Sequence, residues 1–272
     1  MKKIALTSLL AVFAAAGANA ANVIDGNPLY MPKAGHFYSE TALSSHSETI
    51  ESWAVSEEFG YGISDKLAVS VKTDIFEMES FDAYGWGSLA LNATFRAFDK
   101  GAWKVDAYAG YGINPSFGGE RTGALILSDD VDTYWFEQDN TAYAWTLGVR
   151  GGYTTGDWTV AGHVAFNYMG TESFNWGDEG WHTWAFGVDG QYVIDSNWSL
   201  VAGLEYTAIT DDGMGEDLGR WTGEFGVNYN IDATKYVGAY INAAMNHHEG
   251  DAHDSWGFED GFGFGVKFGI DF

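Results

Sequence analysis

The last twelve residues alternate without a break between large apolar residues and residues that are small or charged. The large residues are Phe262, Phe264, Val266, Phe268, Ile270 and Phe272, and the others are Gly261, Gly263, Gly265, Lys267, Gly269 and Asp271. Only a β-strand sends alternate residues to opposite faces. Glycine does not pack the core of a soluble sandwich, whereas the wall of a barrel in lipid is apolar outside and small or polar inside. The pattern therefore predicts one strand of a membrane barrel.

The same alternation recurs along the chain. It predicts an all-β fold, an up-and-down antiparallel transmembrane barrel of about twelve strands within residues 36–272. The expected strands cover residues 36–45, 53–62, 67–75, 89–97, 103–111, 143–153, 158–168, 184–194, 198–207, 221–229, 237–245 and 261–272. Glu57 interrupts the apolar face of the second strand.

Connections of two kinds alternate between the expected strands. Short turns follow the even-numbered strands and longer loops follow the odd-numbered ones. A barrel with both termini in the periplasm needs this parity, because its periplasmic turns are short and its outer loops are long. A strand of about 11 residues tilted by ~45° covers roughly 26 Å, close to the apolar band of an outer membrane. A soluble β-protein has no reason to sort its loops in this way.

Aromatic residues recur where the expected strands begin after a short turn. Trp103, Trp158, Trp198 and Tyr236 each hold such a position. Amphipathic rings are most favourable at the membrane–water interface, so we expect these residues to form a ring at the periplasmic rim of the barrel.

Residues 1–20 have the three parts of a secretory signal: a basic start, an apolar run too short to span a bilayer, and a small-x-small site at Ala18–Ala20. We expect the mature chain to begin at Ala21. Residues 21–35 show no periodicity and are expected to form a short periplasmic arm. The chain has no cysteine, so it must be stabilised without disulfides.

The chain is strongly acidic, with 38 Asp and Glu against 13 Lys and Arg and a formal net charge of −25. Removing the two lysines of the signal leaves 11 basic residues and a net charge of −27. Such a chain does not bind nucleic acid by counter-ion release, but it can attract cations. We expect no cofactor.

These features together resemble the bacterial outer-membrane β-barrel proteins, over the signal and essentially the whole mature chain. The resemblance implies an outer-membrane location. It also implies that the terminal strand, with Phe268, Ile270 and Phe272, is the signal read by the barrel-assembly machinery. Twelve-stranded members of this group include solute channels, a phospholipase and autotransporter translocators, so strand number does not select a function.

Charged residues on the expected inner face are the first candidates for function. They are Glu58, Lys72, Asp74, Arg96, Lys104, Asp106, Arg150, His163, Asp189, Glu205, Glu224 and Lys267. The basic members gather on the third to sixth strands, and most of the acids lie on the eighth to tenth and the second. This division predicts a basic wall facing an acidic wall, as suits a passive channel for small polar solutes or cations. Alternatively, the charges pair and fill the interior, since twelve strands lie between filled and water-holding barrels.

The last outer loop carries a concentrated set of metal-binding side chains, His247, His248, Asp251 and His253. Histidine and carboxylate suit zinc, and carboxylates alone suit calcium. The spacing matches no metal signature, so a solvated acidic loop is the simpler interpretation.

Two other classes of function compete with a channel. A structural or adhesive barrel would use the longest irregular stretch, residues 112–140, as a constriction or a binding surface. An outer-membrane lipase or protease would need a nucleophile and a base on one face. His46 is flanked by Ser45 and Ser47, but neighbours one apart point to opposite faces. His163 has no serine two residues away, so an enzyme is the third choice.

Overall fold

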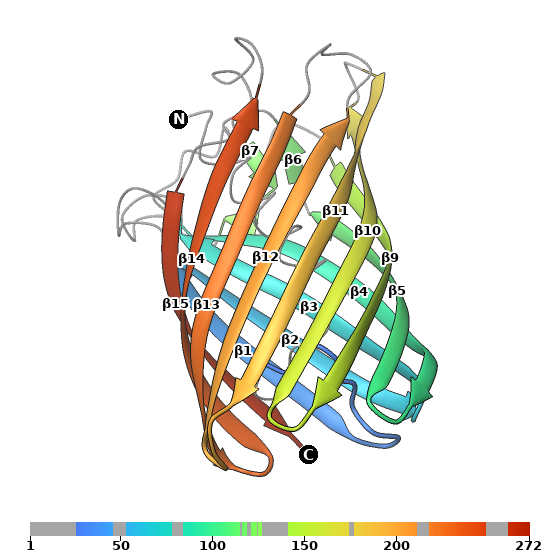
Figure 1. Ribbon diagram of the computed structural model, residues 1–272. Helices are drawn as coiled ribbons and strands as arrows, with labels where there is room; N and C mark the ends of the chain where they lie inside the picture. Colours follow the sequence, from blue (N-terminus) through green and yellow to red (C-terminus); the bar gives the residue numbers. More distant parts are fainter. Residues whose placement is uncertain are drawn as a thin grey trace.

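The computed structural model describes residues 26–45, 53–77, 84–114, 116–118, 121–123, 125–126, 141–173, 177–210, 218–248 and 261–272. Twelve long antiparallel strands form a closed barrel (Figure 1). They are β1 (Phe37–Ser45), β2 (Trp53–Ser64), β3 (Leu67–Glu77), β4 (Tyr84–Lys100), β5 (Trp103–Asn114), β9 (Thr141–Thr155), β10 (Trp158–Ser173), β11 (Gly177–Val193), β12 (Trp198–Thr210), β13 (Leu218–Asp232), β14 (Lys235–His248) and β15 (Gly261–Asp271). No helix in the described residues is long and apolar enough to cross a membrane.

Each long strand pairs with its neighbours in the chain, and β1 pairs with β15 to close the ring. At this seam the amide of Phe37 donates to the carbonyl of Phe272 at 2.7 Å, and the amide of Phe272 donates back to Phe37 at 2.8 Å. The predicted twelve-stranded antiparallel barrel is confirmed. Some strands extend well beyond the expected ranges. β4 and β11 reach 17 residues each, because backbone pairing continues where the apolar alternation has stopped.

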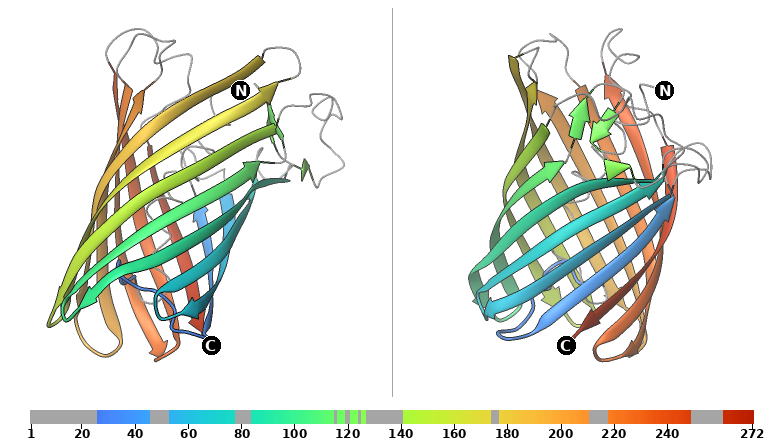
Figure 2. Two further views of the ribbon diagram at one scale, coloured as in Figure 1. Left: turned by 90° about the vertical axis from the view of Figure 1, so that its right-hand side faces the viewer. Right: turned by 180° about the vertical axis from the view of Figure 1, so that it is seen from behind.

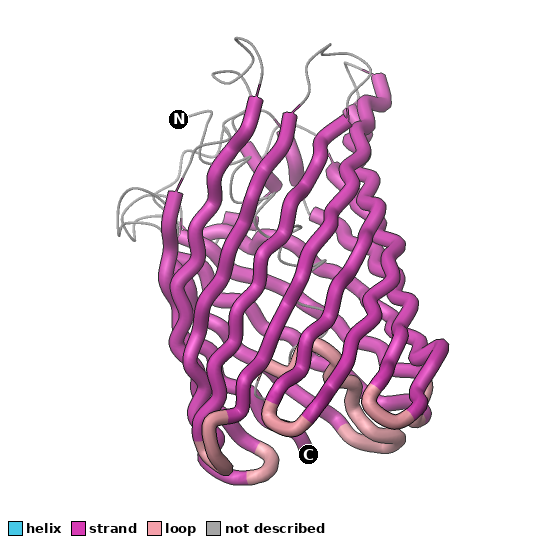
Figure 3. Tube along the Cα trace, in the orientation of Figure 1, coloured by secondary structure: helices cyan, strands magenta, loops and turns pink. Residues whose placement is uncertain are grey.

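The tight turns gather at one end of the barrel, where the C-terminus also lies (Figure 3). They occupy residues 65–66, 101–102, 156–157, 194–197 and 233–234, as the loop parity predicts. The opposite end carries a small hairpin of β6 (Ser116–Gly118) and β7 (Arg121–Gly123), and β8 (Leu125–Ile126) pairs with β4. The long stretch predicted as irregular is therefore partly ordered.

The outer face of the wall is apolar on every long strand. Large side chains such as Leu91, Leu147, Phe186 and Ile241 are roughly half exposed. An exposed apolar surface of this extent is stable only in apolar surroundings, as the wall of a transmembrane barrel has. The barrel views in Figure 2 show that the wall continues around the whole molecule.

Aromatic pairs mark the turn end of this outer face. Trp103 lies against Tyr153, Trp158 against Tyr192 and Trp198 against Tyr229, with ring centroids 4.7, 4.5 and 4.8 Å apart. Each pair joins neighbouring strands, so the expected ring is present for these tryptophans.

The prediction for Tyr236 is wrong. Tyr236 is 1% exposed and donates a hydrogen bond to Glu40 inside the barrel. Val237, the next residue, faces outward instead. The place of a residue just after a turn therefore does not decide whether its side chain points outward or into the barrel. For Tyr236 that direction follows from the register in which β14 pairs with β15.

One polar patch interrupts the apolar outer face. The hydroxyl of Ser39 donates to Glu57 at 2.6 Å, and the hydroxyl of Thr41 donates to the other carboxylate oxygen at 2.5 Å. Val55 and Phe59, two residues either side of Glu57 on β2, are exposed and apolar. The two hydroxyls supply the hydrogen bonds that a carboxylate on a lipid-facing wall needs.

Replacing Glu57 by valine should stabilise the barrel. A charge on the lipid face is unfavourable, and for an acid we expect a cost of roughly 1 kcal/mol, below that of lysine or arginine. Urea unfolding in detergent or lipid should show a higher midpoint for Glu57→Val than for the unmodified chain. Glu58→Gln, a change at the adjacent inward position, is the control and should not stabilise. A lower midpoint for Glu57→Val would contradict a lipid-facing wall at this position.

Candidate functional site

The interior of the barrel is lined by polar and charged side chains. Seven of the twelve charged residues singled out from the sequence are buried: Glu58, Asp74, Arg96, Asp106, Arg150, His163 and Glu205. The other five are partly buried: Lys72, Lys104, Asp189, Glu224 and Lys267. Many of these side chains belong to three clusters of hydrogen bonds and ion pairs. One of the clusters also binds an N-terminal arm that crosses the barrel.

The first cluster is a clamp of two arginines on one aspartate, here called the arginine clamp. Arg96 on β4, Asp106 on β5 and Arg150 on β9 stand in one row across three adjacent strands. Arg96 Nε donates to Asp106 Oδ1 at 2.7 Å, and Arg150 Nε donates to Oδ2 at 2.8 Å. Asp106 is fully buried, so one carboxylate holds two guanidinium groups in charge-assisted hydrogen bonds.

The second cluster places His163 between two acids. Its Nδ1 lies 3.1 Å from Asp189 Oδ2, and its Nε2 lies 2.8 Å from Glu205 Oε2. Thr207 donates a further hydrogen bond to Glu205 at 3.2 Å. Ionised carboxylates only accept hydrogen bonds, so both ring nitrogens can bond at once only when the imidazole carries its second proton.

A glycine makes this reach possible. His163, Gly187 and Glu205 stand in one row on β10, β11 and β12, and the imidazole crosses the middle strand to meet Glu205. A Cβ atom on Gly187 would lie 2.2 Å from His163 Cε1. Glycine on the inner face therefore gives long polar side chains room to bond two strands away.

The third cluster lies at the seam of the barrel. Tyr236 reaches from β14 to Glu40 on β1, across Gly269 of β15 in the same row. Lys267 Nζ donates to Glu224 at 3.0 Å, and the hydroxyl of Tyr38 donates to Glu58 at 2.8 Å.

Opposite charges thus lie next to each other within the wall. The basic wall predicted on the third to sixth strands contains Asp106 between its two arginines, and the acidic wall contains His163 between its two acids. The sequence predicts an electric field across the lumen, from a basic wall to an acidic wall. Pairing of opposite charges at short range weakens that field. Sequence reasoning also missed Glu40 and Tyr38, because the first strand has weak alternation, and it assigned Tyr236 to the outer rim rather than to the interior.

An irregular N-terminal arm, residues 26–36, lies inside the turn end of the barrel, in dark blue in Figure 1. Arg96 Nη2 donates to the carbonyl of Leu29 at 2.7 Å, and Arg150 Nη2 donates to the carbonyl of Tyr30 at 3.0 Å. Leu29 is 1% exposed and Pro28 is fully buried. The arginine clamp therefore binds the arm through two consecutive backbone carbonyls.

Asp271 and Gly62 anchor the arm near the start of β1. Tyr30 donates its hydroxyl to Asp271 Oδ2 at 3.1 Å, and His36 Nδ1 lies 3.2 Å from Oδ1 of the same carboxylate. Gly35 donates its amide to Gly62 at 2.8 Å, and Gly62 donates back to His36 at 2.9 Å. Burial, together with the neighbouring Asp271, raises the pKa of Tyr30, so its hydroxyl keeps the proton that it donates.

The sequence predicts a short, irregular periplasmic arm over residues 21–35. Its described part is irregular, and it lies within the barrel. The contacts to the arginine clamp could not be predicted from side chains, since the clamp binds backbone oxygens of the arm.

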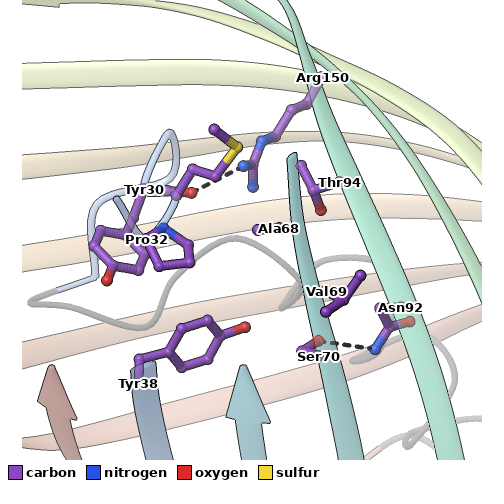
Figure 4. A pocket seen from close by; sticks show the side chains of 10 residues that line it. Tyr30, Pro32, Tyr38, Ala68, Val69, Ser70, Asn92, Thr94 and Arg150 are labelled. Atoms are coloured by element: carbon purple, nitrogen blue, oxygen red, sulfur yellow. Dashed lines mark hydrogen bonds between the residues drawn. The ribbon is translucent and has the colours of Figure 1, made fainter. Parts of the chain in front are cut away.

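A small pocket separates the arm from the wall (Figure 4). Tyr30 and Pro32 border it from the arm, and Tyr38, Asn92 and Arg150 border it from β1, β4 and β9. Asn92 donates to the hydroxyl of Ser70 at 3.4 Å along its edge. Ser70, Asn92 and Arg150 share its lining with apolar residues such as Pro32 and Ala68, and its free space is that of about one water molecule.

The possible metal ligands of the last outer loop, and the serine and histidine near residue 46, lie largely outside the described residues. Only the backbone of His247 and His248 is described, at the end of β14, and Asp251 and His253 lie outside the described residues. In the part of the chain that the structure describes, no three His, Asp or Glu side chains are arranged to hold a metal ion. His46 and Ser47 lie outside it too.

Comparison with known proteins finds similarity in fold alone. No family model matches the chain, and no curated protein sequence matches it. Among solved structures, the NanC porin is similar with a TM-score of 0.58 and 8% identity, over 85% of this chain and 98% of that one. An outer-membrane channel of Pseudomonas putida F1 has a TM-score of 0.58 and 12% identity, over 89% and 97%. The translocator domain of the autotransporter NalP from Neisseria meningitidis has a TM-score of 0.56 and 14% identity, over 97% and 96%.

Asp106→Asn should destabilise the barrel strongly. The change leaves two buried guanidinium groups without their shared counter-charge, and breaking a buried ion pair costs about 3–5 kcal/mol. The urea midpoint of the refolded barrel measures the effect. Asp157→Asn, at an exposed turn position, is the control and should stay within about 0.5 kcal/mol of the unmodified chain. A similarly small effect for Asp106→Asn would show that the clamp does not stabilise the fold.

Proposed function

We propose that the protein is an outer-membrane channel through which small polar solutes or ions diffuse passively. One observation carries the proposal: a closed twelve-stranded wall is apolar outside and charged inside. A lipid-embedded barrel with a polar interior is the architecture of porins. The arrangement lets the wall meet lipid while water and solutes meet the inner side chains.

The similar structures support this proposal at the level of fold. Two of the three are described as a porin and a channel, and the third is a translocator domain. Barrels of similar fold therefore serve more than one purpose, and the preference for a channel rests on this chain's own interior. Location in the outer membrane, after export by residues 1–20, is part of the same proposal.

The interior favours cations over anions. Eight acids line it among the described residues, namely Glu40, Glu58, Asp74, Asp106, Asp189, Glu205, Glu224 and Asp271. Five lysines and arginines oppose them, namely Lys72, Arg96, Lys104, Arg150 and Lys267, together with His163, which is positive when it bonds both of its acids. A narrow lumen with a small excess of negative charge concentrates cations and repels anions.

We further propose that the last strand engages the barrel-assembly machinery. Phe268 and Phe272 point outward and are exposed on β15, and Ile270 is partly exposed. An apolar edge of this kind is available to a partner until β15 pairs with β1 and closes the ring.

The second candidate is a structural barrel that conducts nothing. It is favoured by the arm, which occupies the turn end of the lumen with Leu29 and Pro28 buried. In this case the outer loops would be the functional surface, as an adhesive or structural barrel requires.

Single-channel recording on the refolded chain from Ala21 onward tests the channel. We expect discrete conductance steps with a preference for potassium over chloride. Heat-modifiable migration on a gel shows independently that the barrel is folded. A folded barrel that gives no discrete conductance and no solute flux would contradict the proposal and favour the structural barrel.

Replacing two inner acids should weaken the preference for cations. The double variant Asp189→Asn and Glu205→Gln removes two negative charges while keeping polar side chains of similar size. Reversal potentials in a salt gradient should move toward the unselective value. Asp157→Asn on the exposed turn removes a charge outside the lumen and is the matched control. An unchanged reversal potential in the double variant would show that ions do not pass this cluster.

A further inference from the structure

We infer that the N-terminal arm, residues 26–36, is a gate that closes the turn end of the pore and can leave it as a unit. The inference rests on the proposed channel function and adds to it a closed state and a moving part. Its basis is the way in which the arm crosses the barrel and the kind of contact that holds it, since the arm is not a strand of the wall.

The arm touches wall strands on three sides of the lumen. Gly26 lies beside Val201 on β12 and Asn228 on β13. Leu29 and Tyr30 are bound by the arginine clamp on β4 and β9, and His36 lies beside Asp271 near β15. A segment that contacts these separate parts of the ring spans the bore rather than following one wall, as the dark blue trace in Figure 2 also shows.

The clamp does not need the arm to remain charge-balanced. Arg96 and Arg150 keep their bonds to Asp106 whether or not the arm is present, since those bonds lie within the wall. Each arginine loses one neutral carbonyl when the arm leaves, and water can accept that hydrogen bond. Release of the arm therefore leaves no buried charge without a partner.

The arm is also separate from the hydrogen-bond ladder of the wall. Residues 26–36 contain no strand, and their backbone bonds to the wall are the pair at Gly62, next to the start of β1. Its other contacts to the wall are with side chains and include those of the arginine clamp, Asp271 and Asp65 and an edge-to-face contact of Tyr30 with Tyr38. It can swing about residues 35–36 without opening the barrel.

A disulfide between the arm and the wall would hold the gate closed. A Cβ atom placed on Gly26 lies 3.4 Å from the Cβ of Val201, just below the separation in a disulfide. It also lies 2.8 Å from Asn228 Nδ2, so the end of that side chain must shift, and the φ of 76° at Gly26 adds strain to the bridge. The chain has no cysteine, so Gly26→Cys with Val201→Cys introduces a single bridge. We expect at least a tenfold lower single-channel activity in the oxidised double variant than in the same protein after reduction. Each single variant is a control and should not respond to oxidant or reductant.

A second variant prevents the arm from docking. A Cβ atom on Gly62 would lie 2.0 Å from the carbonyl oxygen of Lys33, so Gly62→Val removes the space that the arm needs at its hinge. We expect a several-fold higher open probability than in the unmodified chain. Ile63→Val changes the next residue, which faces outward, and is the matched control.

The outcomes separate the gate from the channel. Equal conductance in the oxidised and reduced double variant, with the bridge verified by thiol titration, would overturn the gate and leave the channel intact. Where the bridge does not form, an open probability of Gly62→Val equal to that of the unmodified chain would overturn the gate. Folded barrels that stay silent in every form, including the reduced one, would instead contradict the channel itself.

Discussion

Closure of the hydrogen-bond ladder is the constraint on which the rest of this structure depends. In a bilayer no water is present to satisfy a free backbone amide or carbonyl, so a sheet is stable there only as a closed ring. The ring closes where β1 meets β15, and Phe37 and Phe272 bond to each other through both backbone groups at the turn end of that seam. Once every strand is paired, the alternation of side chains assigns one face to lipid and the other to the lumen.

The inner face is shaped by glycine as much as by charge. Long polar side chains lie across a glycine on the intervening strand and bond to a residue beyond it, as His163 does over Gly187 and Tyr236 does over Gly269. These bonds tie together strands that are not neighbours in the ladder. They also keep the charges paired, so the lumen has opposite charges in close alternation. Because most charges are paired, only the small excess of acidic side chains remains to favour cations over anions.

The barrel could be predicted from the sequence because its signals are local. Period-two alternation and the sorting of short turns from long loops are both read within a few residues, and both were correct for the described strands. The partners inside the barrel could not be predicted in this way. Asp106 meets Arg96 and Arg150 because three strands share one row, and that row depends on the register, including a bulge between Arg96 and Phe98. The arginine clamp holds the arm through backbone carbonyls, which carry no sequence signal. Tyr236 shows that an aromatic residue after a turn can face inward.

The central claim is that the polar face lines a water-filled path and the apolar face meets lipid. Single cysteines at Asp189 and at Val188, neighbours on β11 with opposite faces, test it directly in a planar bilayer. A water-soluble, membrane-impermeant thiol reagent should react with Asp189→Cys and reduce the current, and it should leave Val188→Cys unmodified. Reaction at Val188→Cys with none at Asp189→Cys would contradict the orientation of the wall. If the reagent modifies Asp189→Cys and the current does not change, ions do not pass along the polar face, and the claim of a water-filled path there is wrong.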